Sequence, residues 1–131
     1  MEFPYQKEQS RLFGNICRPV AEFEVETELG WAPILAYIDS GADITLLPMS
    51  FITALDIHIE EEDIKDIRGI GDGKLPIIVK RVRMRLAGKT FNTEVAIALI
   101  EDVPFLLGRE GVFDQFEICF RKNRTIRFED A

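Results

Sequence analysis

Apolar and polar residues alternate along most of this chain, and this period of two constrains the fold more than any other feature. Over residues 20–29 apolar side chains alternate with glutamates until Gly30, and residues 31–38 form a second, apolar run. Successive side chains of a strand point to opposite faces, so the pattern predicts half-buried strands. Similar segments follow at spacings of about ten residues, which favours a small β-barrel or sandwich.

Further elements are predicted along the rest of the chain. Pro48 fits the first position of a short helix through Leu55, because the N–H that proline lacks has no partner there. The acidic run at residues 60–63 predicts a solvated loop. Apolar segments bounded by turn residues predict a hairpin with a glycine-rich tip (67–78), two strands (91–100 and 104–107) and a final hairpin (117–120 with 125–128). A short helix is predicted at residues 111–116.

Three arginines at alternate positions indicate one face of a further strand. Val82, Met84 and Leu86 alternate with Arg81, Arg83 and Arg85. We expect the arginines to face solvent. Their charge would also disfavour pairing of the edge of this strand with other chains.

The length of 131 residues predicts one domain, which we place at residues 16–131 after an N-terminal arm at residues 1–15. The arm is either loose or an edge strand that needs a partner.

A net charge of −7 argues against nucleic acid as a partner. No apolar stretch approaches the ~20 residues that span a bilayer, and no signal peptide is recognisable, so we expect a cytoplasmic protein with no membrane partner and with Cys17 and Cys119 reduced.

One polar segment stands out because it interrupts apolar strands. Asp39-Ser40-Gly41-Ala42-Asp43 follows the run at residues 31–38, and Phe-Leu-Leu-Gly-Arg follows at residues 105–109, with the glycine-rich hairpin between them. This ordered set resembles the retropepsin-like aspartic proteases, the family of retroviral proteases and of the DNA-damage-inducible ubiquitin-shuttle proteases. The resemblance spans residues 20–128 and implies a mainly β fold, a small closed barrel with one or two short helices.

The resemblance also implies roles for the residues of the first motif. Asp39 would be the catalytic residue, Ser40 would hydrogen-bond across a dimer, and Gly41 would let the substrate backbone approach closely. Asp43 would form a partly buried pair with Arg109 and help to anchor the substrate backbone. Ala42 and Gly108 would complete the support of the active site.

The glycine-rich hairpin corresponds to the flap of that family. Its tip would consist of Gly69, Ile70, Gly71, Asp72 and Gly73, and we expect Gly71 to use a positive φ. The flap would fold over an extended peptide and exclude water. Ile44, Ile70 and Leu107 would contribute apolar pockets for its side chains.

A single Asp-Ser-Gly motif supplies half of an aspartic protease site. Hydrolysis needs two carboxylates that share a proton, one as base toward water and one as acid toward the carbonyl. A second copy of the chain supplies the other aspartate by two-fold symmetry, and the apolar surface of the C-terminal hairpin predicts where it docks. We therefore predict a homodimeric aspartic endopeptidase, a hydrolase of peptide or protein substrates that needs no cofactor or metal.

Other interpretations remain open at this point. A catalytically silent dimeric module of the same fold could bind peptides or serve in assembly. Asp39-Ser40-Gly41 alone also fits an ordinary Asx turn. The glycines at 69–73 are less consistent with a phosphate loop, because no helix pattern follows them, and the acidic residues lack the ligand spacing of an EF-hand.

Overall fold

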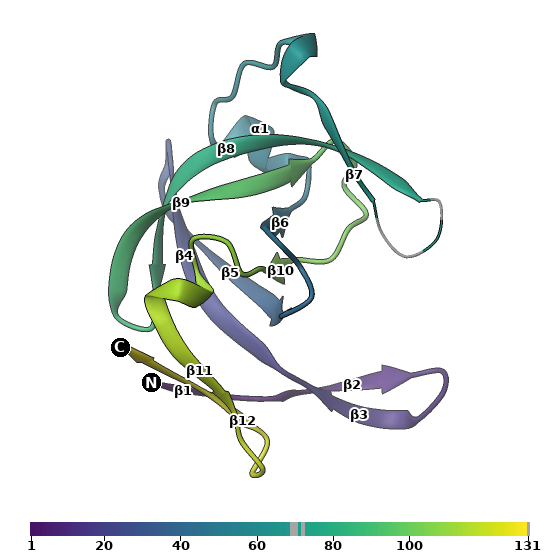
Figure 1. Ribbon diagram of the computed structural model, residues 1–131, viewed down its shortest axis with the longest axis vertical. Helices are drawn as coiled ribbons and strands as arrows, with labels where there is room; N and C mark the ends of the chain where they lie inside the picture. The colour runs from purple at the N-terminus through teal and green to yellow at the C-terminus, as the bar shows by residue number, and fades with distance from the viewer. Residues whose placement is uncertain (69–70, 72, 131) are drawn as a thin grey trace.

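Five of the predicted strands and one that the sequence analysis missed, at residues 45–47, form one closed barrel. The computed structural model describes residues 1–68, 71 and 73–130 (Figure 1). The ring runs through β4 (Val20–Thr27), β5 (Gly30–Ile38), β10 (Leu106–Leu107), β6 (Thr45–Leu47), β9 (Lys89–Ala98) and β8 (Lys74–Leu86), which pairs back onto β4. β10 lies parallel to β5 and β6 lies parallel to β9, whereas the other neighbours are antiparallel. The prediction of a mainly β, closed barrel is confirmed.

The core of the barrel follows the alternation that the sequence predicts. On β4, Phe23 and Val25 are buried and Glu24 between them points outward, while on β5 Ile34, Ala36 and Ile38 face inward. The largest core cluster also includes Met84 and Leu86 of β8 and Ile97 of β9. Burial of these side chains provides most of the driving force for closing the ring.

The arginine row lies where the barrel closes, so the expectation of an edge strand is wrong. Arg85 is opposite Glu24 across the β4–β8 pair and donates two hydrogen bonds of 2.9 Å to its carboxylate. These bonds hold the pKa of Glu24 below its usual value. The guanidinium also lies 4.3 Å from the centre of the Trp31 ring, and Arg83 pairs with Glu26. Both arginines therefore join two strands of the ring.

The helical segments are short. α1 (Ser50–Ala54) begins two residues after Pro48, and its Phe51 packs edge-on against Phe105. The acidic run that predicted a loop forms a 3-10 turn, η1 (Glu61–Asp63), and η2 (Phe113–Gln115) replaces the helix expected at residues 111–116. No helix in the described part of the chain is long and apolar enough to cross a membrane.

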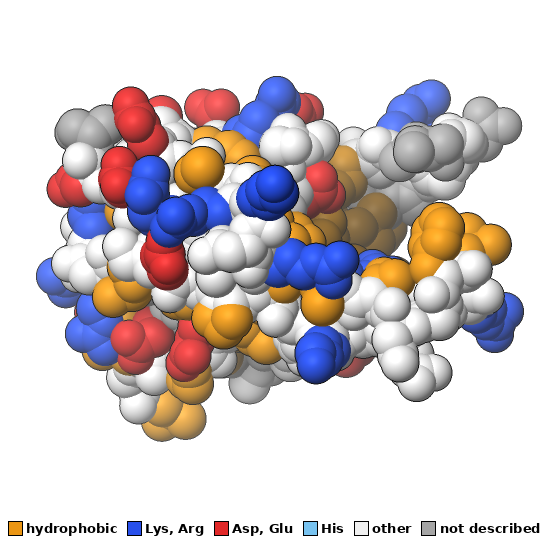
Figure 2. Space-filling view, turned by 90° about the horizontal axis from the view of Figure 1, so that it is seen from below, with side chains coloured by type: hydrophobic (Ala, Val, Ile, Leu, Met, Phe, Trp, Pro, Cys, Tyr) orange, Lys and Arg blue, Asp and Glu red, His pale blue; other side chains and the backbone are white. Residues whose placement is uncertain are grey.

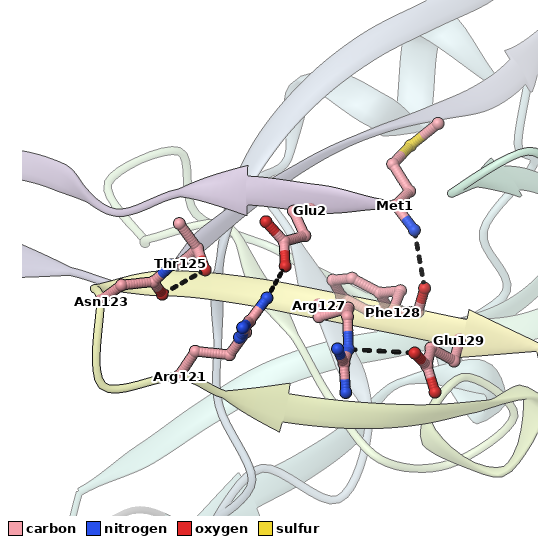
Figure 3. A network of polar contacts seen from close by, with 8 residues as sticks. All are labelled: Met1, Glu2, Arg121, Asn123, Thr125, Arg127, Phe128 and Glu129. Atoms are coloured by element: carbon pink, nitrogen blue, oxygen red, sulfur yellow. Dashed lines mark hydrogen bonds and ion pairs between the residues drawn. The ribbon is translucent and has the colours of Figure 1, made fainter.

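The first and last strands of the chain share a second, three-stranded sheet. β12 (Thr125–Asp130) lies between β1 (Glu2–Pro4) and β11 (Phe116–Phe120). Figure 3 shows how the ends are tied: the N-terminal ammonium of Met1 donates to the carbonyl of Phe128 at 3.0 Å, and Arg121 pairs with Glu2. Of the two alternatives for the N-terminal arm, the start of the chain thus takes the paired strand.

The apolar side chains of this sheet are buried within their own chain. Ile126 is fully buried, Phe128 is 2% exposed, and the Phe128 ring packs edge-on against Phe3 and Phe116. The expectation that this surface awaits a second copy is therefore wrong for these side chains. β12 also has neighbours on both edges.

Two hairpins extend from the barrel. β7 (Lys65–Arg68) pairs with the first part of β8, which confirms the predicted hairpin. β2 (Gln6–Ser10) and β3 (Gly14–Arg18) form a separate two-stranded sheet. In Figure 1 both hairpins project toward the same side, to the right of the barrel.

Candidate active site

Asp39 lies at the point where β5 leaves the barrel. Its backbone N–H donates to the carbonyl of Leu107 at 3.1 Å, and its carbonyl accepts from the N–H of Ala42 at 3.1 Å. The carboxylate Oδ1 accepts from the N–H of Gly41 at 2.9 Å. Both the backbone and the side chain of Asp39 are thereby fixed, and the residue is half-buried, with Ser40 and Gly41 exposed beside it.

Close packing at Gly108 holds this turn against the neighbouring strands. The Gly108 N–H donates to the hydroxyl of Thr45 at 3.1 Å in a fully buried position. A Cβ at Gly108 would lie 2.4 Å from the carbonyl carbon of Ile44, closer than real Cβ contacts come. Only glycine fits here. Thr45 is a supporting residue that the sequence analysis missed, since a threonine in an apolar strand gives no signal of its partner.

Asp43 and Arg109 form the ion pair that the resemblance implies, but the pair is not buried in the single chain. The side chain of Asp43 is 88% exposed and that of Arg109 is 53% exposed. Backbone bonds connect the same segments, from Arg109 N–H to Ala42 and from Glu110 N–H to Asp43. Because these bonds hold the segments together, the ion pair is not needed for that purpose.

An open pocket of about 430 Å³ lies beside Asp39. It is lined by Arg18, Pro19, Tyr37, Ile38, Asp39, Pro104 and Leu106. Leu107, predicted to line a pocket, is instead fully buried in the core, and its neighbour Leu106 takes that place. Ile44 packs against the small cluster around Leu46. The alternation on β5 could have identified Tyr37, since Ala36 and Ile38 point inward.

Tyr37 connects this pocket to the N-terminal hairpin. Its hydroxyl donates to Glu8 Oε1 at 2.7 Å, and the Arg18 guanidinium lies 5.7 Å from the centre of its ring. The hydrogen bond to Glu8, together with burial and the charge of the same carboxylate, raises the pKa of Tyr37. The same ring lines a second pocket of about 670 Å³, shared with Glu8, Asp102 and Pro104. The two pockets thus share Tyr37 and Pro104 as lining residues.

The predicted flap is described only in part. Gly69, Ile70 and Asp72 lie outside the described residues, whereas Gly71 and Gly73 lie within them and are exposed. Gly71 has φ +86°, the positive value expected from the sequence. Gly73 lines a small separate pocket with Ile67 and Leu75, so the described residues of the hairpin do not reach the pocket at Asp39.

The barrel and the turn at Asp39 define a retropepsin-like fold, the fold class that the sequence predicted. The structure is similar to that of EIAV protease complexed with the inhibitor HBY-793, with a TM-score of 0.54 and 22% sequence identity over 78% of this chain and 88% of that chain. No protein-family profile matches the sequence, and no curated protein matches it. Among the described residues, no group of three or more His, Cys, Asp or Glu side chains could hold a metal ion.

Proposed function

We propose that this chain is one half of a homodimeric aspartic endopeptidase and that Asp39 of each chain forms the catalytic pair. The observation that carries the proposal is the placement of Asp39. Its carboxylate is held by the Gly41 N–H at the end of a barrel strand and borders an open pocket. The likeness of the fold to a protease solved with an inhibitor supports the same activity.

In the proposed mechanism the two Asp39 carboxyl groups share one proton. The ionised carboxylate takes a proton from a water molecule, whose oxygen attacks the carbonyl carbon of the peptide bond. The protonated carboxyl gives its proton to the carbonyl oxygen, which yields a tetrahedral diol. The carboxyl that gained the water's proton then passes it to the amide nitrogen as the C–N bond breaks, and a proton from the diol returns to the pair. A carboxylic acid and an amine leave.

The substrate is proposed to be an extended peptide that crosses both chains. Tyr37, Pro104 and Leu106 would contact an apolar side chain near the scissile bond, because their apolar atoms border Asp39. The β7–β8 hairpin would cover the peptide as a flap. Ser40, which is exposed in the single chain, would hydrogen-bond across the dimer, and exposed Asp43 would accept from the peptide backbone.

Cleavage of an unfolded protein such as casein tests the proposal. The wild type should cleave it in a pH series and should be inhibited by a statine-type compound. Asp39→Asn keeps the size and most hydrogen bonds of the side chain, so it should retain the fold and abolish cleavage. Asp56→Asn is the matched control, since exposed Asp56 has φ +51°, which asparagine tolerates, and should leave activity unchanged.

Mixtures of wild-type and Asp39→Asn chains test whether the site needs both aspartates. If chains exchange freely, activity should fall with the square of the wild-type fraction, because a heterodimer has one ionisable aspartate. A linear fall under proven exchange would mean that each chain works alone. A wild type that binds the statine-type compound but cleaves nothing would instead identify a silent peptide-binding module.

A further inference from the structure

The β2–β3 hairpin projects from the barrel and is held to its own chain at its base, by the bonds from Tyr37 to Glu8 and from Arg124 to Cys17. Its two strands pair with each other from Gln6↔Arg18 to Ser10↔Gly14, and neither pairs with another described strand. An isolated two-stranded sheet is marginally stable in water. The hairpin nevertheless extends beyond the barrel (Figure 1), so its tip is available to contact another molecule.

The tip of this hairpin exposes two adjacent large apolar side chains. Leu12 is 85% exposed and Phe13 is 75% exposed. Figure 2 shows hydrophobic side chains gathered around a hollow at the right-hand end of the molecule, the end from which both hairpins project in Figure 1. An apolar group of this kind at the rim of a hollow is typical of an interaction surface.

The charge of the hairpin identifies the partner. It carries three basic side chains, Lys7, Arg11 and Arg18, against the single carboxylate of Glu8. A net charge of +2 on the hairpin, in a chain of −7, leaves −9 on the remainder. Averaged over its residues, the remainder of a second copy of this chain is therefore opposite in charge to the hairpin.

The base of the hairpin is fixed to the strand that carries Asp39. Glu8 accepts a hydrogen bond from Tyr37, which lies two residues before Asp39, and Arg18 lines the pocket beside that carboxylate. A partner that holds the hairpin would thus be held in register with the active site.

We propose that the β2–β3 hairpin is a dimerisation arm, whose Leu12 and Phe13 dock on a second copy of this chain and bring the partner's Asp39 against the first. The proposal rests on the proposed function, because a single-chain site would not need the arm. Two arms related by the two-fold axis would each contact the barrel of the other chain, so the same surface of each chain would form the interface.

The double variant Leu12→Ser, Phe13→Ser tests the arm by sedimentation equilibrium over a wide range of chain concentration. Removing two apolar anchors should raise the dimer dissociation constant at least about 100-fold. Cleavage per chain should be lost at low concentration and recover at high concentration. Leu29→Ser is the matched control, since Leu29 is 98% exposed at the β4–β5 turn and should change neither quantity.

A second variant, Lys7→Glu with Arg11→Glu, tests the charge argument without touching apolar residues. Its dissociation constant should also rise, and the wild-type constant should rise with salt, because screening weakens the attraction. Circular dichroism should show both variants folded, since the four side chains are exposed.

The outcomes separate the arm from the proposed function. A wild type that is dimeric and active, with an unchanged dissociation constant in both variants, overturns the arm and leaves the proposed function standing. A wild type that cleaves casein as a monomer, or that keeps its activity in Asp39→Asn, overturns the shared site itself. Weaker dimers with activity restored at high concentration support both.

Discussion

Replacing Gly108 with alanine tests whether the close approach of the residue after β10 to the start of β6 positions Asp39. The new Cβ would lie 2.4 Å from the carbonyl carbon of Ile44, 2.5 Å from its oxygen and 2.8 Å from the nitrogen of Thr45. All three atoms belong to the backbone, so no side-chain rotation relieves the contact. An ordinary contact begins at 3.4 Å, so the two strands must separate by about 1 Å.

The cost follows from two contributions. Overpacking of a rigid core costs ~1–3 kcal/mol, and loss of the buried bond from the Gly108 N–H to Thr45 adds about 1 kcal/mol. Gly108→Ala should therefore lower the free energy of unfolding by about 2–4 kcal/mol, or the Tm by on the order of 10 °C for a domain of this size. Cleavage should fall as well. The backbone N–H of Asp39 donates to the carbonyl of Leu107, the residue before Gly108, so a shift of Gly108 should also move Asp39.

Urea unfolding followed by the fluorescence of Trp31 measures this loss, at one fixed chain concentration because dimerisation contributes to stability. Gly73→Ala is the control, since a Cβ there meets nothing within 4 Å, and it should change stability by less than about 1 kcal/mol. Gly41→Ala, 3.3 Å from Asp39 Oδ1, should fall between the two. If Gly108→Ala has the same free energy of unfolding as Gly73→Ala, the backbone around Gly108 moves without cost and the reasoning is refuted.

Further variants at four positions test other parts of the structure. Thr45→Val should cost ~1–3 kcal/mol in urea unfolding by removing a buried acceptor, whereas Thr45→Ser should cost less; equal losses would exclude the hydroxyl. Arg109→Ala should cost about 1 kcal/mol or less, because its pair is exposed, and a loss above about 3 kcal/mol would contradict that exposure. Glu24→Gln should lower the Tm at pH 7, and the difference in Tm should vanish in acid. The pKa of Glu24 is lower in the folded chain than in the unfolded chain, where it is about 4.3. Its carboxylate therefore stabilises the fold above that unfolded-state pKa, and this stabilisation is lost as the pH falls through the folded-state pKa. Gly71→Val should reduce turnover by about tenfold with little loss of stability, since its φ of +86° strains any side chain; unaltered turnover would exclude a conformational role.

Most strands of the barrel could be predicted from the sequence because alternation is a local signal, but the three residues of β6 were too few to show it. Which of two consecutive leucines faces the core could not be predicted. Leu106 and Leu107 form a strand of only two residues, too short to show a period. Their orientation is set by pairing with Tyr37, Ile38 and Leu46, which lie far away in the sequence.

Barrel closure was likewise beyond local reasoning. The arginines of β8 look like an edge face until β4 is known to pair there, some sixty residues earlier in the chain. The motif at residues 39–43 predicted the turn at Asp39 and the pair of Asp43 with Arg109. It gave no signal for the exposure of that pair, because exposure depends on the packing of the whole chain.

The position of β12 between β1 and β11 affects the order in which the chain can fold. β1 is synthesised well before its partner, residues 125–127, because the barrel strands lie between them in the sequence. Until β12 has been synthesised, Phe3 has no Phe128 ring to pack against and β1 has no strand to pair with. Pairing over so long a sequence separation is slow, and an unpaired strand is open to pairing with other chains. Docking of β1 should thus be a late step, after the β4–β5 and β8–β9 hairpins have formed.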